Sequence, residues 1–306
     1  MMIVNTKDVG VVKNVFKKLV LPDKSSHKGQ NGKILIIGGS SLFHAASLWA
    51  AETSSFFVDM VHYSSTLENE KIFLNLKSKF KNGIVVKKKD LLDYVKEDDV
   101  ILMGTGMIRK SKIKNQKSKI ERIQDILSIN DEGDYTYFLT KLLIDNFPKK
   151  KFVFDAGSLQ MMDKDWLLNL KETAIITPHQ KEFEKLFTEK IIDLNLEEKI
   201  NLVEKMAKKY KVVILLKAIK DIISDGKTTY VVEGGNQGLT KGGTGDVLAA
   251  LTASFYCKNN PIKSALIGSL LLKLTSDELF KTYGYWYNVD KIIENLPKVL
   301  KKNIFI

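Results

Sequence analysis

The stretch that most constrains this chain is residues 234–246, which read GGNQGLTKGGTGD and run without a break into the apolar segment VLAAL. Glycine allows backbone N–H groups to approach a ligand closely and to adopt positive φ angles. A helix that begins at such a loop directs unpaired N–H groups and the positive end of its dipole toward whatever lies there. The sequence therefore predicts an anion site, most simply for phosphate, at the start of a helix near residues 246–256.

Asp246 ends this glycine-rich loop, although a carboxylate next to bound phosphate is electrostatically unfavourable. Its position suits a base that takes a proton from an attacking hydroxyl group, or a group that acts through a metal ion. The alternative is a plain glycine-rich turn in which Asp246 only complements the helix dipole. The six glycines, together with Thr244 and Asp246 at a helix start, favour phosphate chemistry.

The net charge of +12 comes almost entirely from lysine, and Arg109 and Arg122 are the only arginines. Proteins that read nucleic-acid bases usually depend on the planar guanidinium group of arginine. The lysines are also spread along the chain, as expected for a solvated surface. We therefore expect no nucleic-acid partner and only a weak attraction for anionic substrates.

The length of 306 residues and a hydrophobic content of 44% are sufficient for a large core, which an α/β protein can build as one unit. We expect a single domain over residues 1–306, with an N-terminal arm at 1–27. Cys257 is the only cysteine, which excludes a disulfide framework and fits a reducing compartment. No apolar run is long enough to span a bilayer, and no signal peptide is evident. These features predict a cytoplasmic protein without a membrane partner.

Short apolar runs that end at glycine or polar residues predict buried strands, and longer segments between them predict helices. The strands are expected at 33–37, 57–63, 84–86, 100–103, 151–157, 173–179, 212–217, 222–224 and 229–232, the last two as a hairpin. The helices are expected at 45–56, 68–80, 137–146, 181–187, 197–210, 246–256, 262–281 and 290–300. We interpret 107–151 as a surface insertion with one core helix, and 130–134 as a loop. The alternation predicts a three-layer α/β/α sandwich around a mostly parallel sheet.

Ligands in such folds bind at the carboxyl ends of the strands. The segments that this edge should collect are 38–41, 104–106, Asp155, His179, Lys217 and the glycine-rich loop. Asp155 is either a turn residue or a carboxylate that meets Mg²⁺ through water. Lys217, at the end of a very apolar strand, either extends to solvent or binds phosphate.

The motif TPHQKE follows one of the predicted strands. A structural account of it makes Thr177 the N-cap of a helix, Pro178 its first residue and Gln180 the partner in a capping box. That account leaves His179 and Glu182 unexplained, and their spacing puts both on one face of the first helical turn. The other three histidines form no metal-ligand spacing, so no metal is assigned to histidine.

The motifs GGS, GTG, DAG, TPHQKEF and GNQGLTKGGTGD, in this order, resemble those of the ADP/ATP-dependent NAD(P)H-hydrate dehydratases of the ribokinase-like superfamily. The resemblance runs from about residue 28 to the end, and its last two motifs are the most specific. It implies a ribokinase-like fold and an enzyme that repairs hydrated nicotinamide cofactors. Residues 1–27 are too short for the epimerase domain often fused to such enzymes. A separate NAD(P)H-hydrate epimerase is therefore the expected partner, and we expect a homo-oligomer.

The resemblance also implies roles for individual residues. The contacts to the hydrated dinucleotide fall on Ala46, Gly106, His179 and Asp246. The contacts to the adenine nucleotide fall on Lys217, Ala218, Ile219, Lys220, Asp221, Asn236 and Gly245. The anion hole falls on Gly242, Gly243, Thr244 and Gly245, and the catalytic base is Asp246. Glu182 matches a metal-associated glutamate that would hold Mg²⁺ through water, with Asp155 as its companion.

The implied activity is the dehydration of hydrated NADH or NADPH (NAD(P)HX) with ADP or ATP as the phosphoryl donor. An alternative is a small-molecule kinase of the same superfamily that phosphorylates a pyrimidine or thiazole alcohol and stops there. A further alternative is a non-catalytic basic protein that binds nucleotide or RNA. His179 argues against the kinase, because sugar-type relatives have asparagine there, and the scarcity of arginine argues against the binding protein.

Overall fold

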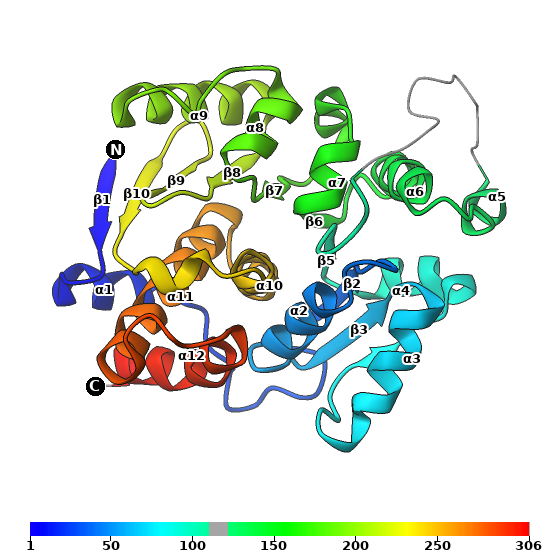
Figure 1. Ribbon diagram of the computed structural model, residues 1–306, viewed down its shortest axis with the longest axis horizontal. Coiled ribbons are helices and arrows are strands. Elements are labelled where there is room, and N and C mark those ends of the chain that lie inside the picture. Colours follow the sequence, from blue (N-terminus) through cyan, green and yellow to red (C-terminus); the bar gives the residue numbers. More distant parts are fainter. Residues whose placement is uncertain (110–121, 306) are drawn as a thin grey trace.

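The computed structural model describes residues 1–109 and 122–305. Within this part of the chain the centre is a ten-stranded sheet with the order β1-β10-β9-β8-β7-β6-β5-β2-β3-β4 (Figure 1). The strands are β1 (Met2–Asn5), β2 (Lys33–Ile37), β3 (Met60–Ser64), β4 (Ile84–Val85), β5 (Val100–Met103), β6 (Lys151–Phe154), β7 (Ile175–Ile176), β8 (Val213–Leu216), β9 (Asp221–Ser224) and β10 (Thr229–Glu233). Only β9 runs antiparallel to its two neighbours.

Helices cover both faces of the sheet (Figure 1). On one face lie α1 (Val9–Phe16), α2 (Ala45–Ser55), α10 (Thr244–Tyr256), α11 (Pro261–Tyr283) and α12 (Val289–Ile304). On the other lie α4 (Leu91–Glu97), α5 (Ile123–Leu127), α6 (Glu132–Asn146), α7 (Ala156–Met161), α8 (Gln180–Phe187) and α9 (Leu196–Tyr210). The edge near β4 carries α3 (Leu67–Asn75), and the short 3₁₀ helices are η1 (Leu76–Ser78), η2 (Lys88–Asp90), η3 (Lys164–Asn169) and η4 (Gln237–Thr240).

Strand β2 shows why both faces need cover. Ile34 and Ile36 belong to the core on the α10 side, whereas Leu35 and Ile37 belong to the core on the opposite side. Successive strand residues point to opposite faces, so a strand that is apolar throughout is stable only between two layers. The predicted three-layer sandwich with a mostly parallel sheet is confirmed.

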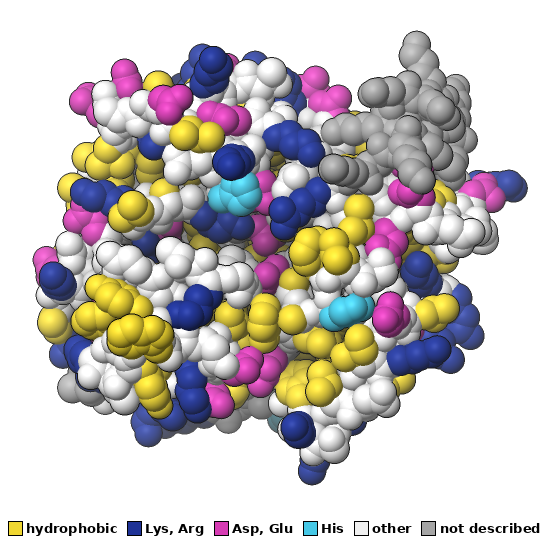
Figure 2. Space-filling model, viewed as in Figure 1, with side chains coloured by type: hydrophobic (Ala, Val, Ile, Leu, Met, Phe, Trp, Pro, Cys, Tyr) yellow, Lys and Arg dark blue, Asp and Glu magenta, His cyan; other side chains and the backbone are white. Residues whose placement is uncertain are grey.

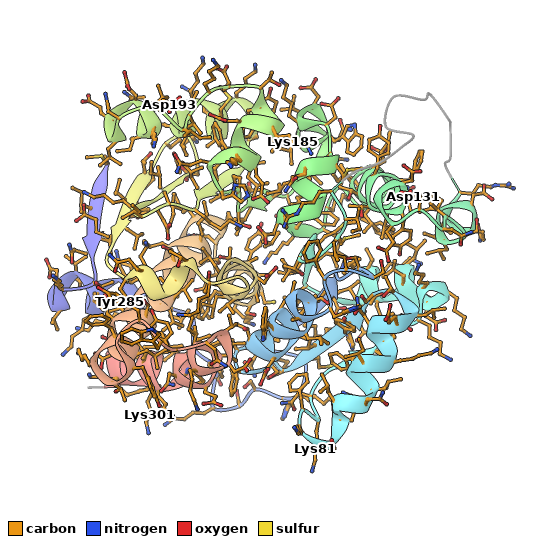
Figure 3. All side chains as sticks on the ribbon, viewed as in Figure 1. Lys81, Asp131, Lys185, Asp193, Tyr285 and Lys301 are labelled. Atoms are coloured by element: carbon orange, nitrogen blue, oxygen red, sulfur yellow. The ribbon has the colours of Figure 1, made fainter. Side chains whose placement is uncertain are left out.

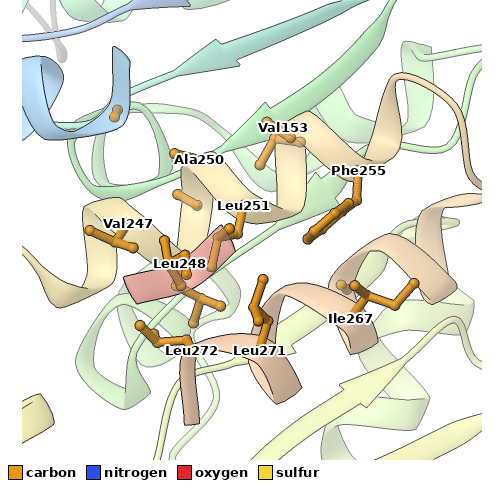
Figure 4. Packing of buried hydrophobic residues seen from close by; sticks show 14 of the residues in the cluster. Val153, Val247, Leu248, Ala250, Leu251, Phe255, Ile267, Leu271 and Leu272 are labelled. Carbon is orange, nitrogen blue, oxygen red and sulfur yellow. The ribbon is translucent and has the colours of Figure 1, made fainter. Parts of the chain in front are cut away.

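Helix α10 is the most deeply enclosed element of the first layer. Figure 4 shows Leu248 and Leu251 of α10 packed beside Leu271 and Leu272 of α11. These leucines expose at most 5% of their surface. Close packing of this kind leaves a helix little freedom to shift. The N-terminus of α10 is therefore held rigidly at the carboxyl edge of the sheet.

Several sequence predictions were wrong in detail. The predicted strand 151–157 ends at Phe154 because α7 begins at Ala156, and of the predicted strand 173–179 only Ile175–Ile176 forms β7. The predicted strand 57–63 starts only at Met60, because the N–H groups of Phe57 and Val58 still bond to Ser54 at the end of α2. The predicted loop 130–134 contains the start of α6, because Asp131 caps that helix by accepting from the N–H groups of its first turn.

The N-terminal region is more ordered than an arm. Residues 2–5 form β1, which pairs in parallel with β10, and α1 buries Val12, Val15 and Phe16. The core helix predicted within 107–151 is α6, while the basic residues 110–121 lie outside the described part. Among the described residues no helix has the length and apolar character needed to cross a membrane.

Candidate active site

The segments predicted to meet at the carboxyl edge do meet there. The Gly39 N–H donates to the carbonyl of Thr105 over 2.7 Å, which joins the loop after β2 to the loop after β5. A Cβ atom on Gly106 would lie 2.9 Å from the Cβ of Ala46, so these two proposed dinucleotide contacts are neighbours. A parallel bridge joins His179 to Lys217, and a Cβ on Gly245 would lie 3.5 Å from Lys217 Nζ.

A buried cluster of charges forms where β6, β7 and β8 end. Lys217 Nζ lies 2.7 Å from Asp155 Oδ1 and 3.9 Å from Glu182 Oε2. Asp155 Oδ1 also accepts from the Thr177 hydroxyl over 2.8 Å. Glu182 Oε1 accepts from Gln160 Nε2 over 3.0 Å. Asp155 and Glu182 expose only 1% and 2% of their surface, so the lysine stands between two carboxylates that water scarcely reaches.

Lys217 and Glu182 are stabilised in their charged forms, whereas burial, together with the Glu182 carboxylate, raises the pKa of Asp155. Burial alone would lower the pKa of Lys217, but the carboxylates of Asp155 and Glu182 outweigh it and raise that pKa. Burial would likewise raise the pKa of Glu182, but the Lys217 ammonium and the N–H of His179 lower it. Lys217 therefore stays positively charged. Figure 2 shows acidic and basic side chains meeting in the hollow near the middle of the face that it draws.

His179 is the N-cap of α8, a place that the sequence analysis gave to Thr177. Its Nδ1 accepts from the Glu182 N–H over 3.3 Å, and Glu182 Oε2 accepts from the His179 N–H over 3.0 Å. The capping box is thus His179 with Glu182, and neither Pro178 nor Gln180 has its predicted role. The Thr177 hydroxyl is instead used by Asp155 and by the carbonyl of Phe154.

The capping bond also sets the protonation of the His179 ring. Because Nδ1 accepts a hydrogen bond, the neutral ring carries its proton on Nε2. Burial lowers the pKa of His179, which keeps the ring neutral near pH 7. The side chain is 44% exposed, and its Nε2 lies 3.5 Å from Glu182 Oε1, so the ring N–H is at the rim of the site beside that carboxylate.

Helix α10 starts at the glycine-rich loop as predicted. Gly243 is its N-cap with φ +101°, and a Cβ there would lie 2.4 Å from Cζ3 of Trp49. The Thr244 hydroxyl donates to the carbonyls of Leu239 and Lys241, which fixes the loop. The N–H groups of Gly245 and Asp246 have no acceptor among the described residues. Unpaired N–H groups at the start of a 13-residue helix form an anion site.

Asp246 combines this position with an altered acidity. Burial raises the pKa of Asp246 to about 7, and the carboxylate of Asp155 adds to the rise. The positive charges of Lys217 and Arg109 oppose it. A carboxyl group with a pKa near 7 can both accept and release a proton at neutral pH, as a general base must.

A cavity of about 430 Å³ opens beside the start of α10. Six of the seven residues that resemblance assigns to the adenine nucleotide line it: Lys217, Ala218, Ile219, Asp221, Asn236 and Gly245. Leu239, Leu248 and Leu272 give it an apolar wall. Apolar walls with a few polar groups are typical of small-molecule sites.

Besides Lys217, three of those seven residues already have side-chain partners within the protein. Asp221 accepts from the Ala218 N–H and the Ser269 hydroxyl, and Asn236 accepts from the Tyr287 hydroxyl. Lys220 is absent from the cavity lining, and its Nζ lies 2.6 Å from Glu233 Oε1. Asp221 and Asn236 therefore shape the cavity walls, Lys220 lies outside them, and Lys217 and Gly245 line the cavity next to the start of α10.

A protein-family model described as NAD(P)H-hydrate dehydratase matches residues 34–298, a range that includes every residue of the site. The chain belongs to the NAD(P)H-hydrate dehydratase family. The bifunctional NAD(P)H-hydrate repair enzyme Nnr of Methanocaldococcus jannaschii is 32% identical over 93% of this chain and 51% of its own length. The chain therefore spans about half of that relative.

Two further proteins resemble the chain along most of both lengths. The ADP-dependent (S)-NAD(P)H-hydrate dehydratase of Nitrosopumilus maritimus is 28% identical over 93% of this chain and 94% of its own. The crystal structure of the ADP/ATP-dependent NAD(P)H-hydrate dehydratase from Bacillus subtilis, co-crystallized with ATP/Mg²⁺, has a TM-score of 0.73, with 95% and 97% of the chains covered. The TM-score shows a shared fold, and at 18% identity the likeness shows nothing beyond the fold.

Two residues at the site of this family member were missed from the sequence. Lys273 of α11 exposes 4% of its surface, lines the cavity and donates to the carbonyl of Ile219 over 2.9 Å. A lysine that interrupts a long apolar helical segment was the available signal. Arg109 lies 5.5 Å from the ring centre of Phe43, and its charge acts on Asp246 and His179. Nothing in the local sequence shows that its loop returns to the site.

Asp155 and Glu182, the residues predicted to hold Mg²⁺, fit a contact with the ion through water. Oδ1 of Asp155 and both oxygens of Glu182 are occupied by donors, and the Lys217 ammonium lies between the two carboxylates. The described residues hold no group of three or more His, Cys, Asp or Glu side chains that could bind a metal ion. Direct coordination through Asp155 Oδ1 or either oxygen of Glu182 therefore does not fit.

Proposed function

We propose that this chain dehydrates hydrated NADH or NADPH with ADP or ATP as phosphoryl donor. Membership of the NAD(P)H-hydrate dehydratase family supports this reaction. The observation that carries the proposal is Asp246, a carboxyl group with a pKa raised to about 7 beside the unpaired N–H groups that begin α10. A base and an anion site at one helix end are what transfer of a phosphoryl group to a hydroxyl requires.

In the proposed reaction Asp246 removes the proton from the ring hydroxyl of the hydrated nicotinamide. The hydroxyl oxygen then bonds to the terminal phosphorus of the nucleotide, and the bond to the bridging oxygen breaks. The backbone from Gly242 to Gly245 holds the transferring group. Phosphate leaves as the ring nitrogen supplies its electron pair, and loss of a proton from the neighbouring ring carbon restores the dihydronicotinamide. Ala46, Gly106 and His179 are proposed to hold the dinucleotide.

We assign the adenine nucleotide to the 430 Å³ cavity, with its phosphates toward Lys217 and Gly245. The lysine is a fixed cation, and an ammonium group there offsets phosphate charge. Mg²⁺ would arrive bound to the nucleotide and neutralise its phosphates, with Asp155 and Glu182 reaching it through water. Co-crystallization of the Bacillus subtilis relative with ATP/Mg²⁺ supports this assignment.

An NAD(P)H-hydrate epimerase is the proposed functional partner. The support is that the Methanocaldococcus relative is a bifunctional NAD(P)H-hydrate repair enzyme. The homo-oligomer expected from the sequence remains a prediction.

The decisive experiment incubates the purified protein with hydrated NADH, Mg²⁺ and either ADP or ATP. Recovery of NADH absorbance together with release of phosphate is the expected result. A kinase would instead consume ATP with a pyrimidine or thiazole alcohol and accumulate the phosphorylated product. A protein that binds nucleotide without turning over either substrate would overturn the proposal.

A further inference from the structure

The N-terminal strand β1 leads directly to the wall of the nucleotide cavity. It lies at the edge of the sheet with β10 as its single neighbour, in a register that places Asn5 opposite Glu233 (Figure 1). The turn that follows Glu233 is Gly234–Gly235, and both glycines line the cavity. A short edge strand is among the least stable parts of a sheet. Since the Gly234–Gly235 turn is part of the cavity wall, the pairing of β1 with β10 helps to hold that wall in place.

Thr6, the residue after β1, is hydrogen-bonded to the same turn. Its N–H donates to the carbonyl of Glu233 over 3.1 Å, and its hydroxyl donates to Asp277 Oδ2 over 2.7 Å. That same Asp277 oxygen accepts the N–H of Gly235 over 3.2 Å. Gly234 has φ +117°, and a Cβ there would lie 2.0 Å from the Thr6 hydroxyl oxygen. The hydroxyl is thus packed tightly against the turn.

One turn of α11 links the Thr6–Asp277 hydrogen bond to the cavity wall at Ile219. Lys273 donates to the carbonyl of Ile219, Asn236 donates to the carbonyl of Ser276, and Asp277 holds Gly235. Figure 3 shows the end of this helix, where Tyr285 marks the turn into α12. The two cavity walls therefore share one support, and Thr6 is bonded to it.

We propose that Thr6 and Asp277 are positioning residues for the nucleotide cavity, so that docking of β1 and binding of the nucleotide favour each other. The proposal rests on the proposed function in one respect, namely that the cavity takes an adenine nucleotide. A coupling of this kind is reciprocal: if docked β1 raises nucleotide affinity, bound nucleotide must stabilise docked β1 by the same factor.

Thr6→Val tests the kinetic half, because valine keeps the shape of threonine and removes the hydroxyl. Loss of a single hydrogen bond should raise the KM for ADP by about 3- to 10-fold. The KM for hydrated NADH and kcat should change less than twofold, and Thr6→Ser should restore the KM for ADP. Val12→Ala, which loosens α1 without touching the turn, should lower Tm and leave both KM values unchanged. Equal rises in both KM values for Thr6→Val would overturn the proposal.

Hydrogen exchange tests the reciprocal half without any catalytic readout. Saturating ADP should slow exchange of the backbone amides in residues 2–6, and Thr6→Val should abolish that protection. If ADP protects these amides in a protein that fails to repair hydrated NADH, the coupling stands and the proposed function falls. If ADP protects the start of α10 but leaves residues 2–6 unchanged, the coupling is wrong while the proposed function stands.

Discussion

Lys217 Nζ lies 2.7 Å from Oδ1 of Asp155, a carboxylate that is buried at the end of β6. Ion pairs removed from water are expensive to form, and the loss of one partner leaves the other charge uncompensated. The protein therefore maintains this pair where the nucleotide cavity meets the start of α10. The free-energy cost of burying this ion pair is explained if Lys217 binds a ligand as well as Asp155.

Lys217→Ala should weaken nucleotide binding more than it weakens binding of the hydrated dinucleotide. It should also lower the free energy of unfolding by about 3 kcal/mol, because Asp155 and Glu182 lose their counter-ion. Calorimetric titration with ADP and thermal unfolding measure the two effects. Lys220→Ala is the matched control, since Lys220 belongs to the same loop but pairs outside the cavity with Glu233. Equal losses of affinity for both ligands would contradict the assignment.

Asp246→Asn should abolish turnover while leaving nucleotide binding largely intact, because the base is needed only in the chemical step. Loss of a positioned base costs about 10²–10⁴ in rate. Because the pKa of Asp246 is raised from 3.8 to about 7, the fold loses stability as pH rises between these two values, and the full penalty of the ionised carboxylate is present above pH 7. Asparagine removes that charge, so Tm should rise at pH 8 and change little at pH 3. Wild-type turnover in this variant would remove Asp246 from the mechanism.

The dependence of activity on pH should follow the ionisation of Asp246. With a pKa of about 7, the base is increasingly protonated in more acidic solution, so kcat/KM should fall about tenfold per pH unit well below that value. The positive charge of Arg109 lowers the pKa of Asp246. Arg109→Gln should therefore move the acid limb to higher pH, and Arg109→Lys should leave it in place. An unchanged limb in Arg109→Gln would show that its charge does not reach the base.

Much of this site is predictable from local sequence, for a physical reason. Asp155 and Lys217 end apolar strands, and parallel strands bring their carboxyl ends to one edge whatever the details of packing. For Asp155 and Lys217 the strand pattern alone determines their approximate place. The glycine-rich loop likewise predicts the start of α10 without information from the rest of the chain.

Other features depend on contacts that the local pattern does not contain. Thr177 is a typical N-cap residue, but Asp155 competes for its hydroxyl, so the N-cap lies two residues later at His179 and α8 begins at Gln180. Strand β1 is four residues long and pairs with residues 228 positions away, so its partner decides its structure. Lys273 faces the cavity only because of how α11 is rotated, which depends on its packing against α10.

Gly243 and Gly242 provide a matched pair of substitutions in the loop. Gly243→Ala places a Cβ 2.4 Å from the Trp49 ring at a φ of +101°, so the loop must shift. Nucleotide binding and turnover should both be lost, with a fall in Tm. Gly242→Ala meets no protein atom within 4 Å, so it should keep the Tm of the wild type. Equal falls in Tm for the two variants, measured by thermal unfolding, would contradict the constraint that Trp49 places on the loop at Gly243.

His179 has two separable roles, as the N-cap of α8 and as an N–H donor at the rim. His179→Ala removes both, so it should cost about 1 kcal/mol of stability for the lost cap and raise the KM for hydrated NADH. His179→Asn keeps a good N-cap and loses the ring Nε2–H, so it should retain the wild-type Tm and still raise that KM. The KM for ADP should change little in either variant, because the proposed nucleotide cavity does not include His179. If His179→Asn behaves as the wild type with hydrated NADH, His179 acts only as a cap and the dinucleotide is bound by other residues.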